Sequence, residues 1–153
     1  MRIENKLNYK YRILVLISLA AIVLARPLIA TNLEYNIEKV EHNFNHPWSS
    51  ATLPNGDILV TELIGKIKRI DIKTREVIDI NGIPNALFRG QGGLSDIILH
   101  PEFEKNSIVL ISFSYGEKNK NTLKVISAEL IRNELMNKKI IFEATPYRKS
   151  SNH

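Results

Sequence analysis

The chain has 153 residues, no cysteine and a formal net charge of +5, and the missing cysteines exclude a disulfide framework, a thiolate metal site and a cysteine nucleophile. Residues 1–30 carry five Lys/Arg and one Glu, a net +4, so the remaining residues are almost neutral. We find no basic patch interleaved with aromatic residues, and we therefore predict no nucleic-acid partner.

The chain begins with the pattern of a secretory leader. A basic start precedes the apolar run Ile13 to Ala25, which has thirteen residues and is too short for a comfortable membrane span. We predict a signal peptide over residues 1–30 with cleavage after Ala30, followed by a lead-in segment over residues 31–44. The protein would then be exported to the bacterial periplasm or secreted, without stable membrane association. An uncleaved N-terminal anchor is the alternative.

Short runs of β-branched and apolar residues follow, bounded by turn residues. The Asn55-Gly56 pair is a strong hairpin signal between two of them. Pleated surfaces favour the residues that dominate these runs. The sequence predicts four strands here, over residues 48–53, 58–62, 66–72 and 77–80.

A loop over residues 81–93 ends in the sequence Gly90-Gln91-Gly92-Gly93, and four more strand candidates come after it. Glycine is used where the backbone takes positive φ or approaches another group closely. A glutamine amide held on such a bend presents both a donor and an acceptor. The predicted strands cover residues 94–99, 108–114, 123–130 and 139–143, with a helical turn at residues 133–137.

The two groups of four strands have the same plan, so the chain is predicted to be all-β. Their first strands start 45 residues apart, at Ser49 and Leu94, which is close to the period of four-stranded propeller blades. Blade-like units over residues 48–80 and 94–143 would form part of a β-propeller. A single eight-stranded antiparallel sandwich would satisfy the same strand count.

Several motifs in order resemble the glucose/sorbosone dehydrogenase family, soluble propeller enzymes that oxidise sugars with pyrroloquinoline quinone (PQQ). The resemblance covers residues 45–153, essentially the whole chain after the leader. It implies the first two blades of a six-bladed propeller. The matching segments are Asn45 to Glu62, Gly65 to Lys68, Gly90 to Phe103, Ser112 to Tyr115 and Ile141 to Glu143.

The resemblance also implies roles for two residues. His153 matches the family's general base, which takes the proton of the sugar C1 hydroxyl while hydride passes to PQQ. Gln91 matches a contact residue at the sugar and quinone site. By this resemblance the intact family binds PQQ and Ca²⁺ and acts on aldose sugars, and we do not expect this chain alone to bind either cofactor, because the cofactor-holding segments come from later blades.

Other residues are given structural roles. We expect Trp48 to be a core residue and the Asp96 carboxylate to accept backbone N–H bonds at a blade edge. His42 and His46 are four residues apart, but metal ligation at that spacing needs a helix, which Pro47 argues against.

Because the chain stops at His153, we expect an amino-terminal part of a PQQ-dependent sugar dehydrogenase that is inactive alone. A second hypothesis is a non-catalytic secreted module for binding or structure that reuses two blades. A third is complementation by a separately encoded downstream fragment that completes the ring.

Overall fold

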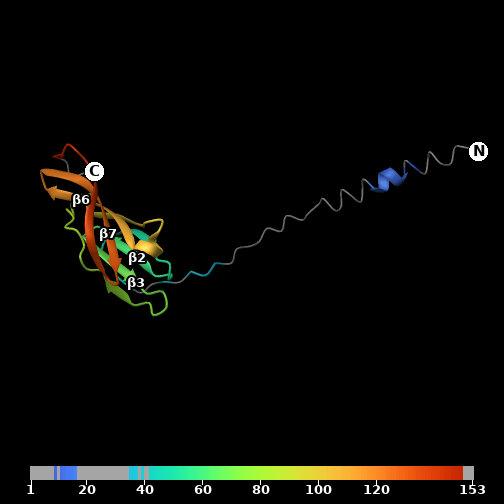
Figure 1. The fold of residues 1–153 in the computed structure, drawn as a ribbon, viewed down its shortest axis with the longest axis horizontal. Coiled ribbons are helices and arrows are strands. Elements are labelled where there is room, and N and C mark those ends of the chain that lie inside the picture. The colour runs from blue at the N-terminus through green and yellow to red at the C-terminus, as the bar shows by residue number, and fades with distance from the viewer. Residues whose placement is uncertain (1–8, 10, 17–34, 38, 40–41, 150–153) are drawn as a thin grey trace, which may run out of the picture. The chain divides into compact units, whose positions relative to one another are not determined.

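The computed structural model describes residues 9, 11–16, 35–37, 39 and 42–149 (Figure 1). Residues 11–16 are helical, and no helix of these ranges is long and apolar enough to cross a membrane. Most of the predicted signal peptide, residues 1–30, lies outside the described residues. The remaining described chain is all-β apart from one short helix, as the sequence predicts.

The first sheet is a four-stranded antiparallel meander in the order β1-β2-β3-β4. The predicted Asn-Gly hairpin is present, since β2 pairs with β1 in the register Thr52↔Ile58. β3 ends two residues earlier than predicted because the Asp71 carboxylate accepts the N–H groups of residues 73 and 74 at 2.8 Å, which fixes a turn. The strands are β1 (Pro47–Thr52), β2 (Ile58–Glu62), β3 (Lys66–Ile70) and β4 (Val77–Asp79).

The second sheet repeats this order as β5-β6-β7-β8, with the short helix α2 between its first two strands. The predicted helical turn at residues 133–137 is wrong. A turn at Arg132 and Asn133 joins β7 to β8, and Ile131 pairs directly with Glu134. The elements are β5 (Leu94–Leu99), α2 (Phe103–Asn106), β6 (Ile108–Glu117), β7 (Lys120–Ile131) and β8 (Glu134–Glu143).

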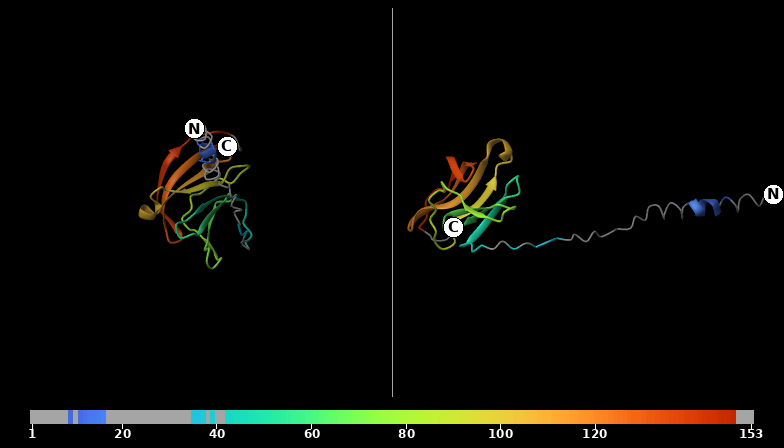
Figure 2. Two further views of the ribbon diagram at one scale, coloured as in Figure 1. Left: turned by 90° about the vertical axis from the view of Figure 1, so that its right-hand side faces the viewer. Right: turned by 90° about the horizontal axis from the view of Figure 1, so that it is seen from below.

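The two sheets pack beside one another as adjacent blades of a β-propeller (Figure 2). Each is a complete meander, and β5 contacts both β1 and β2 of the first sheet. Each sheet is built from four consecutive strands and no described strand leaves one sheet for the other, which is the arrangement of propeller blades and not of a single eight-stranded sandwich. One apolar core spans both sheets, and it includes Leu59, Ile67, Leu94, Ile97, Ile111 and Leu135.

One junction between the blades lies where β5 begins. The backbone N–H of Leu94 donates to the carbonyl oxygen of Leu63 at 3.1 Å, and the Thr61 hydroxyl donates to the Ser95 carbonyl at 2.6 Å. A Cβ atom on Gly93 would lie 2.2 Å from that Leu63 oxygen. Only glycine therefore allows the backbones of the two blades to approach this closely.

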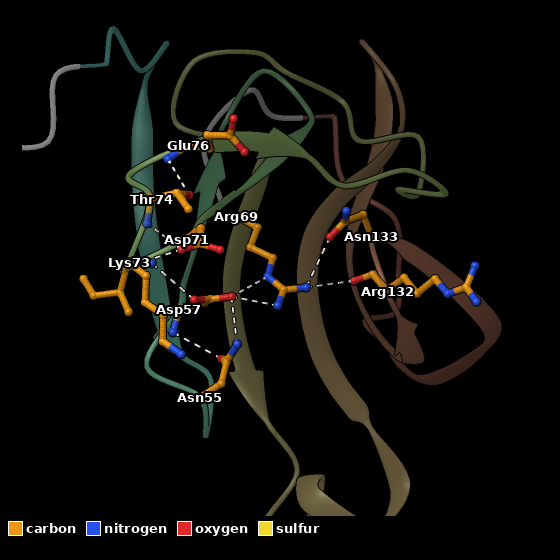
Figure 3. A network of polar contacts seen from close by, with 10 residues as sticks. Asn55, Asp57, Arg69, Asp71, Lys73, Thr74, Glu76, Arg132 and Asn133 are labelled. Carbon is orange, nitrogen blue, oxygen red and sulfur yellow. Dashed lines mark hydrogen bonds and ion pairs between the residues drawn. The ribbon is translucent and has the colours of Figure 1, made fainter.

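An ion-pair network joins the blades at the other end of the sheets (Figure 3). The Asp57 carboxylate is buried and accepts two bonds from the Arg69 guanidinium, at 2.8 Å from Nε and 2.7 Å from Nη2. Nη1 of Arg69 donates across the interface to the Arg132 carbonyl and to Asn133 Oδ1, each at 3.2 Å. One arginine thus connects β3 to the β7–β8 turn.

Some apolar side chains stay outside the core. Trp48 is 56% exposed, so its predicted core position is wrong for the described chain. It lies on β1, which pairs only with β2 in the first sheet. On β8, the large side chains of residues 136 and 140–142 are also exposed. These positions form a surface over the outermost strand of the second blade.

Replacing Asp57 with Asn tests the network. Burial alone would raise the pKa of Asp57, but hydrogen bonds from two side chains and one backbone N–H, with the charge of Arg69, lower it below 3.8. Its stabilising contribution is therefore present above the unfolded pKa and is lost as pH falls through the folded pKa. We expect Asp57→Asn to lower the free energy of unfolding at neutral pH by about 2–3 kcal/mol, measured by urea denaturation.

Asp79→Asn is the matched control, because Asp79 also pairs with a basic residue of β3, Lys68, but its side chain is 62% exposed. An exposed pair contributes about 0–1 kcal/mol. Equal losses in the two variants would show that the buried network does not hold the blades.

Candidate functional site

One end of the second sheet gathers the segments that carry the two predicted site residues. The four strands are antiparallel, so the start of β5, the β6–β7 turn and the end of β8 lie at the same end. Gln91 precedes β5, and residues 144–149 follow β8. The topology therefore places the Gln91 bend and the segment leading to His153 at a common end.

The bend itself is a tight turn with Gln91 at its tip. Arg89 and Gly92 exchange backbone hydrogen bonds of 3.1 and 2.9 Å, and Gly90 adopts a positive φ of 60° between them. The Gln91 side chain is exposed and makes no hydrogen bond within the described residues. Its amide can thus donate to and accept from a ligand.

The bend is fixed on both sides by β6 and its turn. The backbone N–H of Ser114 donates to the Gly93 carbonyl at 2.9 Å, and the Leu87 N–H donates to the Ser114 carbonyl at 2.8 Å. Before the bend, Arg89 Nη1 donates to the Lys118 carbonyl at 2.8 Å. These contacts hold the Gln91 backbone in one place relative to the sheet.

The segment after β8 runs along the start of β7. Asn121 and Arg148 exchange backbone hydrogen bonds of 3.0 and 2.8 Å, and the Ala144 N–H donates to the Leu123 carbonyl at 3.0 Å. His153 lies outside the described residues, so its predicted role as general base stays a prediction. The described chain brings the residues that lead to it, up to 149, to the same end of the sheet as Gln91.

A polar cluster anchors this segment. Lys124 is buried, with its Nζ 3.6 Å from the centroid of the Tyr115 ring and 3.3 Å from Glu143 Oε2. The Tyr147 hydroxyl donates to the other Glu143 oxygen. This hydrogen bond is the main cause that raises the pKa of Tyr147 to about 12, and it also lowers the pKa of Glu143.

The sequence analysis did not identify this cluster, although one signal was present. Side chains of a strand alternate between its faces, so Lys124 belongs to the same face as the buried residues Ile126, Ala128 and Leu130. A lysine on an inward face needs a partner, because burying an unpaired charge is costly. Glu143, its partner, faces it across the β7–β8 ladder.

Other residues do not add to the site. The Asp96 carboxylate is exposed and accepts no hydrogen bond from the described residues, so its predicted structural role is wrong; instead, its N–H donates to Ser112 Oγ at 3.1 Å. Within the described ranges, no group of three or more His, Asp or Glu side chains could hold a metal ion. Within the described residues, the site end thus offers the exposed Gln91 amide on a fixed backbone and no metal-ligating cluster.

The amino-acid sequence of the chain is similar to those of a known family and of two known proteins. Residues 44–153 match the model of the family described as Glucose / Sorbosone dehydrogenase. The chain is 34% identical over 116 residues to an uncharacterized protein of Synechocystis sp., covering 71% of this chain and 28% of the relative. It is 31% identical over 94 residues to the aldose sugar dehydrogenase YliI of Escherichia coli, covering 61% and 25%. The chain thus spans about a quarter of these relatives' length.

Solved structures with the same fold include the soluble aldose sugar dehydrogenase of E. coli in its apo form, with a TM-score of 0.67 and 27% identity over 73% of this chain and 33% of that one. The PQQ-bound aldose sugar dehydrogenase of Streptomyces coelicolor matches with a TM-score of 0.60 and 26% identity, covering 73% and 34%. A crystal structure of a glucose dehydrogenase gives a TM-score of 0.71 and 30% identity, covering 78% and 36%.

The Tyr147–Glu143 bond can be tested by titrating the tyrosines through their absorbance. One phenol should ionise with a pKa of about 12. Because the pKa of Tyr147 is raised in the folded state, the bond contributes to the free energy of unfolding below the unfolded pKa of 10.0. This contribution is lost as pH rises through the folded pKa. Tyr147→Phe should remove this transition, and Glu143→Gln should move it back toward 10.0. The transition should persist in the control Tyr35→Phe; its persistence in Tyr147→Phe would refute the assignment.

Proposed function

The chain belongs to the glucose/sorbosone dehydrogenase family, and from this premise we propose that it is the amino-terminal part of a PQQ-dependent sugar dehydrogenase. The reaction is oxidation of the C1 hydroxyl of an aldose, with PQQ as the hydride acceptor. The observation that supports it best is the exposed, unpaired Gln91 amide on a fixed bend, at the sheet end that also holds the segment before His153.

In this proposal Gln91 binds and orients the sugar, and His153 takes the proton from the C1 hydroxyl. Imidazole suits this work because its ordinary pKa lies near neutral pH. The proton must leave the hydroxyl before or as hydride leaves C1, so the base must stand on the same side of the site as the amide. The shared end of the sheet meets that requirement for the segment up to residue 149.

The described residues do not by themselves fit either cofactor of the family. PQQ carries three carboxylates and needs several cations or N–H groups, whereas the bend contributes a single amide and the nearby Arg89 is bound to a carbonyl. Ca²⁺ requires six to eight oxygen ligands, and no acidic cluster exists among the described side chains. We therefore assign no step through PQQ to the described residues and expect the 153 residues alone to be inactive.

The second candidate is a non-catalytic secreted module. The observation that favours it is the single apolar core shared by both sheets, because one contiguous core is what an independently folding unit needs. Export through residues 1–30 is part of both proposals. A soluble, monodisperse and cooperatively melting product that gives no sugar oxidation in any context would support the module.

A chimera tests the dehydrogenase. Residues 45–153 replace the matching segment of the E. coli aldose sugar dehydrogenase, and PQQ-dependent dye reduction is measured with glucose. The chimera should be active, and His153→Gln should lower kcat by about 10²–10⁴-fold, the usual contribution of a general base. Gln91→Ala should chiefly raise KM.

The matched control is Asn81→Ala, which truncates another exposed amide after β4 at the opposite end of the second sheet and should leave both constants unchanged. A folded chimera that binds PQQ but oxidises no sugar, or full activity of His153→Gln, would refute the proposal.

A further inference from the structure

A cavity of about 540 Å³ opens at the end of the second sheet where the Gln91 bend also lies. Its walls come from three segments: loop residues 85–87, the β6–β7 hairpin and the segment after β8. This volume lies within the range of small-molecule sites in proteins. The polar and aromatic side chains of its lining are Asn85, Tyr115, Glu117, Lys120 and Tyr147.

Each wall is held in place by contacts already present. Backbone bonds tie Leu87 to Ser114 at 2.8 Å, and Asn121 to Arg148 at 3.0 and 2.8 Å. The buried Lys124 contacts the Tyr115 ring, and the half-buried Glu143 pairs with Lys124 and accepts from the Tyr147 hydroxyl. The cavity is thus formed before any ligand arrives, which lowers the conformational entropy lost on binding.

Apart from the Tyr147 hydroxyl, which donates to Glu143, the side-chain polar groups of the cavity are available to a ligand. Within the described residues, the side chains of Asn85 and Glu117 make no hydrogen bond. Lys120 Nζ lies 6.0 Å from the centroid of the Tyr147 ring. An amide, a carboxylate and an ammonium group together supply donors and acceptors.

The charges in the cavity decide which class of ligand fits. Glu117 and Lys120 carry opposite charges, so the pair favours neither an anion nor a cation. Two tyrosine rings add apolar surface beside these polar groups. A neutral polyhydroxylated ring uses all of these features, because its hydroxyls donate and accept while its C–H faces pack on aromatic rings.

We propose that this cavity is a saccharide subsite, which takes a sugar unit next to the one that is oxidised. The cavity loop, residues 85–87, leads within a few residues to Gln91, and Tyr147 lies six residues before His153. A glycan chain can therefore extend from the reacting unit into the cavity. The adjacency to a reacting unit rests on the proposed function, and the preferred substrates are then di- and oligosaccharides.

The test is titration of the isotope-labelled full chain with maltose, followed through backbone amide signals by NMR. We expect shifts at Leu87, Glu117 and Lys120. Glu117→Gln should weaken binding about tenfold, because it removes a charge-assisted hydrogen bond but keeps the shape. The control Glu134→Gln makes the same change on an exposed residue at the opposite end of the sheet and should bind as the unaltered chain does.

Asn85→Ala serves as a second variant, and it too should weaken maltose binding. Absence of shifts at the cavity, or equal affinity in all variants, would overturn the subsite. The titration contains neither PQQ nor dye, so its outcome is separate from that of the chimera. Cavity binding with an inactive chimera would refute the dehydrogenase alone, and an active chimera with no cavity shifts would refute the subsite alone.

Discussion

The approach of the Gly93 backbone to the Leu63 carbonyl is the contact on which the arrangement of both blades depends. A side chain at position 93 would place its Cβ 2.2 Å from that oxygen, far inside van der Waals contact. With glycine there, Leu94 can donate to the same carbonyl and begin β5 against the first blade. The Gln91 bend lies two residues before this point, so the junction of the blades also sets the position of the site.

The two ends of the sheets have different polar chemistry. At one end Asp57, Arg69 and Asn133 satisfy one another across the blade interface. At the other end Gln91, Asn85 and Glu117 have no hydrogen-bond partner among the described side chains. A stable interface and a surface ready for a polar ligand therefore occupy opposite ends of the same two sheets.

Much of this fold could be predicted from sequence, because local signals and tertiary packing agree. The Asn55-Gly56 turn and the apolar runs of β2, β5 and β6 place those strands closely. The helical turn predicted at residues 133–137 is wrong because cross-strand pairing with β7, which no local pattern reveals, makes these residues part of β8. The predicted core position of Trp48 is wrong because an apolar side chain is buried only where another element covers it.

The site was harder to predict than the fold. The glycine bend was recognised by pattern, and the structure supplies the reason for Gly93 and for the exposure of Gln91. The Lys124–Glu143–Tyr147 cluster depends on a cross-strand register that no local motif encodes. The cavity beside it arises from three segments that are distant in sequence, so only the folded chain brings its side chains together.

The most direct test of this account is the free energy of unfolding of Gly93→Ala, compared with Gly65→Ala. Gly65 has a positive φ of 96° but nothing within 4 Å of an added Cβ. Gly65→Ala should therefore lower the free energy of unfolding only by the backbone strain of a side chain at positive φ, about 1–2 kcal/mol. Gly93→Ala should lower the free energy of unfolding by about 3 kcal/mol or more, because the Leu63 backbone must move. A loss in Gly93→Ala no larger than in Gly65→Ala would contradict the claim that this backbone contact holds the blades together.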